Sequence, residues 1–405
     1  MEYNKGDINM CKKTLCRLSF FLFLCLFFAV ILSGCSANKN SPKSVVKREL
    51  NLIKDLDEET IESFSSYKIS SENENIPDEV RESTLEAMKL FFQNFSYKIE
   101  NTNVTEDQAV VTVAITNIDA QTLANDLCRA IIADSLNHPA KAEQSSVAFY
   151  SDLLIQLLTQ KQYELKTTTL DIPLEKSEGI WTIISSDKLV DSLVGGLSSY
   201  MMDPNIVSAE ELVEINLNHF QNMTPDQFLS YFGIDDIFST SSSIANDIDL
   251  SFASQILNNL TFEIISSHQD DSSAEVLVDI TNLDLYSVLD SYKYALLAYA
   301  ETADPILATE QERNEKTAFL LLESLQDADE LTTNTISIQL KNTGLIWEIQ
   351  NTAELTEAVL GNITEASSAF SEASQQTKMF SDETETEESS PQTNLENMPV
   401  IQPAA

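Results

Sequence analysis

Residues 94–119 read NFSYKIENTNVTEDQAVVTVAITNID, and residues 259–284 read NLTFEIISSHQDDSSAEVLVDITNLD. The same pattern of alternating apolar residues thus occurs twice in the chain. Aligned without a gap at an offset of 165 residues, the two copies are identical at nine of 26 positions. Solenoid repeats are about 20–50 residues long, so a repeat of this length predicts two tandem domains.

Apolar residues alternate with polar ones within this stretch. In the first copy they fall on one face of two strands, which carry Phe95, Tyr97 and Ile99 and then Ala109, Val111, Val113 and Ile115. In the second copy the opposite face reads Glu275, Leu277, Asp279 and Thr281. A sheet with one apolar and one largely polar face is typical of antiparallel strands covered on one side only.

Helical periodicity surrounds the strands. In the first copy we predict helices at 45–56, 58–66, 77–92, 120–137, 146–161 and 187–197, with a second hairpin around 170–183. In the second copy the pattern gives helices at 285–301 and 311–325. The match resumes at an offset of 166, where Trp181 pairs with Trp347 and Gly195 with Gly361. This order predicts an α+β domain with an antiparallel sheet of about four strands, packed on one face by helices.

The N-terminus carries an export signal. Lys12, Lys13 and Arg17 precede an apolar run of 15 residues, 18–32, which is shorter than the roughly 20 residues of a spanning helix. The run ends in Leu32-Ser33-Gly34-Cys35, which resembles the lipobox of bacterial lipoproteins. The resemblance implies cleavage between Gly34 and Cys35 and lipidation of the Cys35 thiol. The expected location is the extracytoplasmic face of the cell membrane, with the lipid on Cys35 as the membrane contact. Translation from Met1 or from Met10 would give the same mature chain.

The predicted organisation follows from these boundaries. Residues 1–34 form the signal peptide, 35–44 the lipidated cysteine and tether, 45–201 the first repeat, 206–363 the second repeat and 364–405 an acidic disordered tail. A helical continuation to about Phe380 is the alternative for the start of the tail. Pro204 interrupts helical periodicity between the repeats. The run 382–388 is rich in Glu and Thr, and such composition cannot bury enough apolar surface to fold.

Two known families resemble the repeated unit. The residues that carry the likeness are the lipobox, Phe95-Ser96-Tyr97-Lys98-Ile99, the strand ending in Thr116-Asn117-Ile118-Asp119, and Gly179-Ile180-Trp181-Thr182-Ile183. They resemble the cone-shaped α+β domains of the nuclear-transport-factor class, and tandem-domain lipoproteins of Gram-positive bacteria. The likeness covers about residues 44–363. The helical pair inserted between the two hairpins departs from the simplest cone-shaped pattern.

Charge and cysteine content exclude several functions. The chain has a net charge of −40; residues 1–34 hold four Lys/Arg and two Asp/Glu, which leaves 20 basic and 62 acidic residues. This acidity argues against nucleic-acid binding, which requires basic patches. Beyond Cys35 the mature chain keeps only Cys128, so no intramolecular disulfide is expected, and helical spacing places Cys128 in the core. No glycine-rich phosphate loop occurs, and no cofactor is predicted.

No set of residues predicts catalysis or a metal site. Asp119 and Asp284 each end a strand and precede a helix, which favours helix capping over acid–base work. Trp181 and Trp347 are expected in the core, with stacking on a ligand as the alternative. His138, His219 and His268 occupy non-equivalent positions and lack metal-binding spacing. Packing is expected for four tyrosines of the second copy, with an exposed partner surface as the alternative: Tyr286, Tyr292, Tyr294 and Tyr299.

Three functional hypotheses follow. The first is a non-enzymatic envelope lipoprotein that binds a protein partner or a small ligand. If the tryptophans and aliphatic residues fill the interiors of both domains, a surface interaction gains over binding inside the cone. The second is an isomerase- or hydrolase-like enzyme, which requires a buried Asp or His facing a polar cleft. The third is a structural spacer without a pocket or an apolar patch.

Overall fold

The computed structural model describes residues 41–55, 78–138, 147–234, 242–350 and 352–369. The chain divides into two compact units, Met1–Ser208 with Gly344–Ile346, and Ala209–Thr343 with Trp347–Ala405. The predicted helix at 58–66 lies outside the described residues, as do the signal peptide and residues 370–405 of the tail.

The first unit alternates helices and hairpins. Its elements are α2 (Pro42–Asp55), α4 (Asp78–Phe92), β1 (Ser96–Thr105), β2 (Gln108–Ile118), α5 (Ala120–Asn137), α6 (Val147–Gln160), β3 (Leu165–Ser177), β4 (Ile180–Ile183), α7 (Asp187–Leu193) and α8 (Leu197–Met202).

The second unit has the same order of strands, with three helices before its first hairpin and the short helix α13 between the two longer helices that follow. Its elements are α9 (Ala209–Gln221), α10 (Pro225–Phe232), α11 (Ala245–Asn259), β5 (Thr261–Gln269), β6 (Ser273–Leu283), α12 (Leu285–Ala300), α13 (Asp304–Leu307), α14 (Glu310–Gln326), β7 (Leu331–Asn342), β8 (Trp347–Ile349) and α15 (Thr352–Val359).

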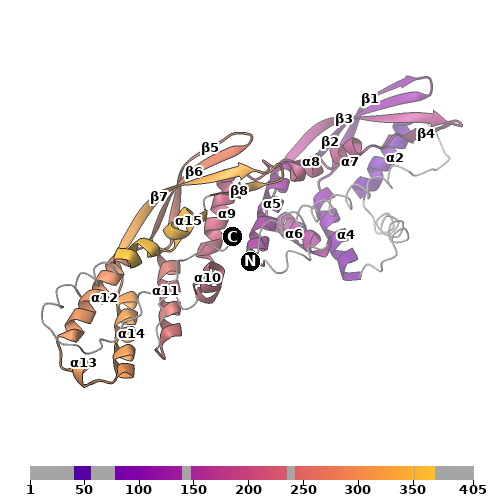
Figure 1. Cartoon of the computed structure of the whole chain (residues 1–405). Helices are drawn as coiled ribbons and strands as arrows, with labels where there is room; N and C mark the ends of the chain where they lie inside the picture. The colour runs from indigo at the N-terminus through magenta and orange to yellow at the C-terminus, as the bar shows by residue number, and fades with distance from the viewer. Residues whose placement is uncertain (1–40, 56–77, 139–146, 235–241, 351, 370–405) are drawn as a thin grey trace, which may run out of the picture. The chain divides into compact units, whose positions relative to one another are not determined.

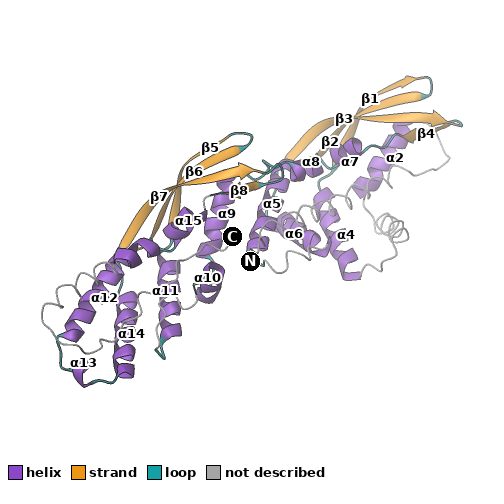
Figure 2. Cartoon of the chain, viewed as in Figure 1, coloured by secondary structure: helices purple, strands orange, loops and turns teal. Residues whose placement is uncertain are grey.

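Each unit contains a four-stranded antiparallel sheet, with the orders β1-β2-β3-β4 and β5-β6-β7-β8 (Figure 2). The two sheets match in detail. Each first strand has a bulge at the same place, between Ile99 and Asn101 in β1 and between Ile264 and Ser266 in β5. The predicted α+β class with two tandem sheet-and-helix units is therefore confirmed.

Helices cover one face of each sheet (Figure 1). The inward side chains of the central strands, such as Val111, Val113, Val276 and Val278, are fully buried. Burying each such aliphatic side chain stabilises the fold by about 1.5–3 kcal/mol. The outward faces are polar, and threonine hydroxyls pair across the strands in both units at 2.7 Å. One-sided burial therefore fixes which face of each sheet the helices cover.

The structure corrects four local expectations. The helix predicted at 187–197 is interrupted, because Gly195 and Gly196 have φ angles of +71° and +83° and end the first helical segment. Helix α13 was not predicted. Helix α2 begins at Pro42, inside the expected tether. Residues 363–369 are helical rather than part of a disordered tail, and Ile363 and Ala366 are buried.

Candidate functional site

The predicted processing site lies outside the described residues, because Gly34 and Cys35 precede residue 41. None of the helices within the described ranges is long and apolar enough to cross a membrane. Lipidation at Cys35 therefore stays a prediction from the sequence.

Asp119 and Asp284 cap helices, as predicted. The Asp119 carboxylate accepts a hydrogen bond from the Gln121 amide at 3.1 Å, and the Asp284 carboxylate accepts one from the Tyr286 amide at 3.0 Å. Lys166 lies 2.8 Å from Asp119. Burial alone would raise the pKa of Asp119, but the hydrogen bonds from Lys166 and Thr122 together lower it. Both aspartates satisfy free helix N–H groups, which explains why they recur in the repeat.

The tryptophans belong to the cores of their units. Trp181 is 6% exposed and Trp347 is 1% exposed. Stacking on a ligand, considered above as their alternative role, is therefore not supported, because the packed core leaves neither ring surface open. By the criterion stated for the cone interior, an outer-surface interaction gains over binding inside the cone. Cys128 is fully buried in the core of the first unit, as predicted.

The histidines and tyrosines are scattered rather than gathered. His138 contacts Asp134 on the surface, and His219 is buried, which lowers its pKa. Core packing is correct for Tyr292, which is buried, and partly so for Tyr299, which is half-buried, whereas Tyr286 and Tyr294 are exposed. The structure does not bring these residues together into a site.

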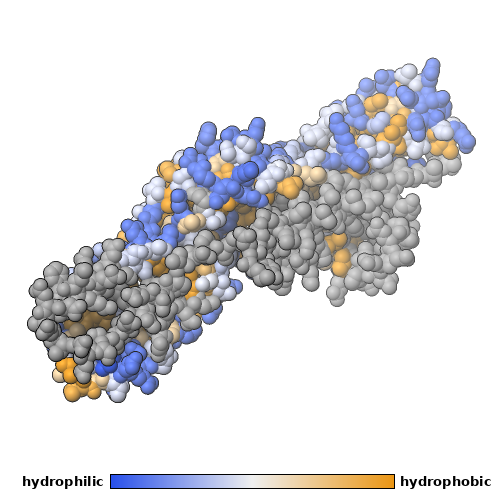
Figure 3. Space-filling view, in the orientation of Figure 1, coloured by the Kyte–Doolittle hydropathy of each residue, from blue (hydrophilic) through white to orange (hydrophobic). Residues whose placement is uncertain are grey.

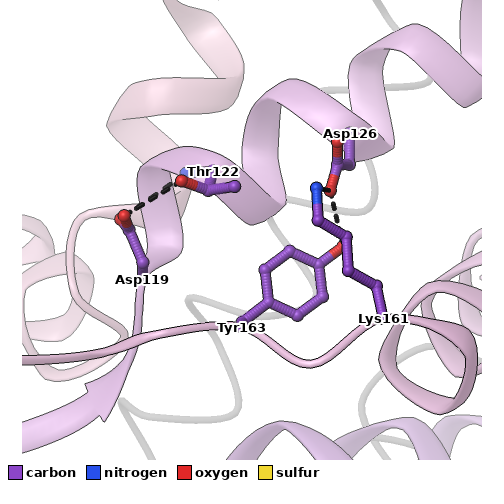
Figure 4. Close-up of polar contacts among 5 residues, drawn as sticks. All are labelled: Asp119, Thr122, Asp126, Lys161 and Tyr163. Atoms are coloured by element: carbon purple, nitrogen blue, oxygen red, sulfur yellow. Dashed lines mark hydrogen bonds and ion pairs between the residues drawn. The ribbon is translucent and has the colours of Figure 1, made fainter.

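The first unit contains a closed polar cluster between α5 and β3 (Figure 4). The Asp126 carboxylate accepts hydrogen bonds from the Lys161 ammonium at 2.5 Å and from the Tyr163 hydroxyl at 2.8 Å. The same ammonium lies 5.3 Å from the centroid of the Tyr163 ring. Burial and the Asp126 carboxylate raise the pKa of Tyr163. Carboxylate, ammonium and phenol thus satisfy one another.

The second unit contains a cavity in the corresponding place. It has a volume of about 480 Å³ and lies between α12, α14 and the segment before β7. Acidic and hydroxyl side chains line it together with small or aliphatic ones: Ser287, Val288, Ser291, Ala295, Leu320, Glu323, Ser324, Asp327, Ala328, Asp329 and Glu330.

The closed cluster and the cavity occupy equivalent positions of the repeat. Helices α6 and α14 end at Gln160 and Gln326, and the strands that follow begin at Leu165 and Leu331. The amides of the capping aspartates donate to the carbonyls of Glu164 and Glu330. The offset of 166 is therefore a structural correspondence as well as a sequence match.

This correspondence reveals a reversal of charge. Lys161 of the first unit becomes Asp327, and Tyr163 becomes Asp329. At the offset of 165, Asp126 becomes Ser291. The groups that close the first site are thus absent from the second.

The carboxylates of the cavity lack cationic partners within the described part of the chain. No ion pair or side-chain hydrogen bond joins any described residue to these four carboxylates: Glu323, Asp327, Asp329 and Glu330. All four side chains are exposed. The cavity is therefore an open acidic site rather than a buried ion-pair network.

An apolar surface lies on the same helices. Ile306 and Leu307 of α13 are 85% and 82% exposed, and Tyr294, Leu297 and Phe319 are also exposed. Figure 3 shows apolar side chains at the end of the second unit that carries α13. Tyr294 and Phe319 directly precede Ala295 and Leu320, which line the cavity. Exposed apolar side chains gathered on one surface are typical of interaction sites.

Within the described ranges, no group of three or more His, Cys, Asp or Glu side chains is arranged to hold a metal ion. The carboxylates of the cavity are therefore spread around its lining rather than converging on one point.

No protein-family model matches the chain, and the search of curated proteins finds no relative. Among solved structures, the chain matches the "putative lipoprotein (ycdA)" of Bacillus subtilis. The identity is 15%, the match covers 65% of this chain and 95% of that one, and the TM-score is 0.23. A TM-score this low carries no argument about fold or function.

No sequence motif predicts the cavity. The internal alignment does show the difference that opens the cavity, because Lys161 aligns with Asp327 and Tyr163 aligns with Asp329 at the offset of 166. A search for catalytic motifs does not detect such a difference, since no single residue of the cavity belongs to a known pattern.

Proposed function

We propose that the protein is a non-enzymatic lipoprotein, anchored outside the cytoplasm through Cys35, whose second unit binds a ligand or partner in the cavity between α12 and α14. The observation that carries this proposal is the contrast between the two units. In the first unit, the side chains of Asp126, Lys161 and Tyr163 bond to one another, whereas the equivalent site of the second unit is an open cavity of about 480 Å³.

Several features support binding rather than catalysis. An acid–base enzyme needs a carboxylate or histidine held in an environment that tunes its proton affinity. The carboxylates of this cavity are exposed, and no histidine lines it. The cavity volume falls within the range of about 300–1,000 Å³ that is usual for small-molecule sites.

The lipobox supports the anchoring part of the proposal. Lipid chains contribute about 0.8 kcal/mol per buried CH₂, so two or three chains hold a protein firmly to a membrane. Replacing Cys35 with Ala should therefore abolish metabolic labelling with a fatty-acid analogue and release the protein from the membrane fraction. Labelling that persists in Cys35→Ala would contradict anchoring through this residue.

Photocrosslinking in intact cells tests the binding part. The photoreactive amino acid p-benzoylphenylalanine would replace Ala328, which lines the cavity, in the full-length protein. Gln162 is the equivalent position of the first unit and is exposed, so it provides a matched control. We expect a defined adduct at position 328 that position 162 does not form.

A second variant shows whether the adduct depends on the cavity. The triple replacement Ser291→Asp, Asp327→Lys and Asp329→Tyr introduces the closing groups of the first unit. We expect this variant to lose the adduct at position 328. The proposal fails if positions 328 and 162 crosslink alike, or if the closed variant keeps the adduct.

A further inference from the structure

The stretch Leu331–Ile336 of β7 has a paired strand on one side only, and we call it the open edge. We infer that the open edge binds an extended segment of another polypeptide as an added strand, with basic side chains at every second position of that segment. The open edge shares no residue with the lining of the cavity between α12 and α14. The inference therefore goes beyond the proposed function and does not depend on it.

Strand β8 covers only one end of β7. It pairs with Leu340–Asn342, and the Gln350 N–H donates to the Gln339 carbonyl at 2.8 Å. Before Gln339, β7 pairs with β6 on one side, and no strand among the described residues pairs with it on the other. A strand exposed in this way presents a row of N–H and C=O groups that can pair with another chain.

The register shows which backbone groups face outward from this edge. The Asp284 N–H donates to the Glu330 carbonyl at 2.9 Å, and hydrogen-bonded pairs alternate along an antiparallel ladder. The N–H and C=O groups of Thr333 and Thr335 therefore point away from β6. The bond to the Gln339 carbonyl, on the same side and in the same phase, agrees with this assignment.

The apolar face of the sheet is incompletely covered at the open edge. Val278 and Ile280 of β6 are fully buried, whereas their partners in register, Ile336 and Asn334, are only half-buried. Leu331 is 51% exposed. A strand added beside β7 would cover these side chains. Its inward-facing residues should therefore be apolar, because apolar residues gain most from that burial.

The polar face of the sheet is acidic beside the open edge. The Thr335 hydroxyl donates to the Asp279 carboxylate at 2.5 Å, so towards the edge this hydroxyl can only accept. Glu263 lies directly opposite Asp279 on β5, and like charges in that position destabilise a sheet. No described cation forms an ion pair with either carboxylate.

This acidic face determines the charge of the partner. Asp279 already reaches across to Thr335, so a side chain from the added strand needs to cross only one strand spacing, about 4.7–4.9 Å. Lys and Arg are long enough for this and carry the N–H donors that the hydroxyl and the carboxylates accept. The outward-facing residues of the partner should therefore be basic.

The equivalent edge of the first unit is protected. It carries Lys166, Asp171 and Pro173, and charged residues and prolines discourage strand pairing at an edge. From Leu331 to Gln339, β7 has no charged residue and no proline, and its register with β6 has no bulge. The second unit thus keeps a regular edge where the first unit does not.

A second copy of the chain fits the open edge less well than a basic segment. The chain has a net charge of −40, and pairing two β7 edges would bring two acidic faces together. A basic segment meets the opposite charge instead.

Fluorescence anisotropy with the full-length lipidated protein in a neutral detergent tests the inference. The probe is the labelled peptide acetyl-Thr-Lys-Val-Lys-Val-Lys-Thr-amide. One control peptide has N-methylated lysine and valine amides, so it keeps the charge but cannot donate main-chain hydrogen bonds. The other control peptide has Glu in place of Lys. We expect the probe to bind and both control peptides to bind at least about tenfold more weakly.

Two matched variants locate the site. Thr335→Pro removes an N–H that points away from β6, so it deletes no bond of the β6–β7 ladder, and it should weaken binding about tenfold or more. Thr169→Pro makes the same change at the equivalent position of the first unit and should change binding less than about twofold.

Two further measurements do not depend on the proline variants folding normally. Glu263→Gln with Asp279→Asn leaves the backbone of β7 unchanged and should weaken binding of the basic probe about tenfold. In the unaltered protein, the probe should slow amide hydrogen exchange at Thr333 and Thr335, because their N–H groups become bonded.

Several outcomes would overturn the inference. It fails if the probe does not bind, or if the N-methylated peptide binds as well as the probe, because attraction would then depend on charge alone. It also fails if Thr335→Pro binds as tightly as the unaltered protein, or if the acidic peptide equals the basic one. A dimer of the free protein that Thr335→Pro dissociates would assign the edge to a second copy. Crosslinking at position 328 tests the proposed function separately.

Discussion

Gly361 is the position where one methyl group should damage the second unit most. It follows α15 with a φ of +67°, in the left-handed region. A Cβ atom there would lie 2.6 Å from the Leu283 carbonyl oxygen at the end of β6 and 3.3 Å from Leu285 Cγ. The closest contact is backbone, which cannot turn away as a side chain would. The change Gly361→Ala must therefore shift the helix relative to the sheet.

The expected cost has two parts. A non-glycine residue in the left-handed region costs about 1–2 kcal/mol. Overpacking against a fixed group costs about 1–3 kcal/mol more. We therefore expect Gly361→Ala to lower the free energy of unfolding of the second unit by about 3 kcal/mol. That is a large share of the roughly 5–15 kcal/mol that stabilises a typical domain.

Gly233 provides a matched control in the same unit. Its φ is +64°, but a Cβ atom would have no neighbour within 4 Å. The change Gly233→Ala should therefore cost only the conformational part, about 1–2 kcal/mol. The difference between the two variants measures the contact with Leu283.

Each unit carries one tryptophan, which makes the measurement specific. In a Trp181→Phe background, the fluorescence of Trp347 reports only on the second unit during urea unfolding. The reasoning is refuted if Gly361→Ala proves no more destabilising than Gly233→Ala.

Three further predictions concern titratable groups. Asp126→Asn removes the carboxylate that raises the pKa of Tyr163, so a spectrophotometric titration should show this phenol ionising at lower pH; an unchanged titration would count against the cluster. The pKa of Asp119 is lowered in the fold, so its contribution to the stability of the first unit is complete above the unfolded value of about 3.9 and is lost as the pH falls through the folded value. Asp119→Asn keeps a capping side chain and should flatten that acid transition, and an identical transition would disprove it. Burial lowers the pKa of His219, so the second unit should lose stability as the pH falls below about 6.5; His219→Gln should remove this dependence in fluorescence-monitored unfolding, and the same slope in both proteins would exclude it.

Most of the fold was predictable because it depends on period and repetition. Alternation identified the strands, and the internal match showed that whatever held for one copy should hold for the other. The capping roles of Asp119 and Asp284 followed from their place between strand and helix. These features are local, so a single sequence is enough to predict them.

The remaining features depend on tertiary geometry. The break at Gly195 and Gly196 arises because positive φ angles end the helix, although apolar spacing continues beyond it. The cavity arises because Asp327 and Asp329 replace groups that would reach across to α12, and whether such a gap stays open depends on how closely helices pack. The pattern of residues along the chain does not show how far apart two packed helices lie.

The bulges in β1 and β5 affect whether copies of this protein can pair through the edges of their sheets. Each bulge lies in a strand at the edge of its sheet, where free N–H and C=O groups could pair with a strand of a neighbouring molecule. The extra residue, Glu100 or Ile265, breaks the regular ladder and increases the local twist. Both units therefore carry the same irregularity against edge-to-edge association of strands from different copies.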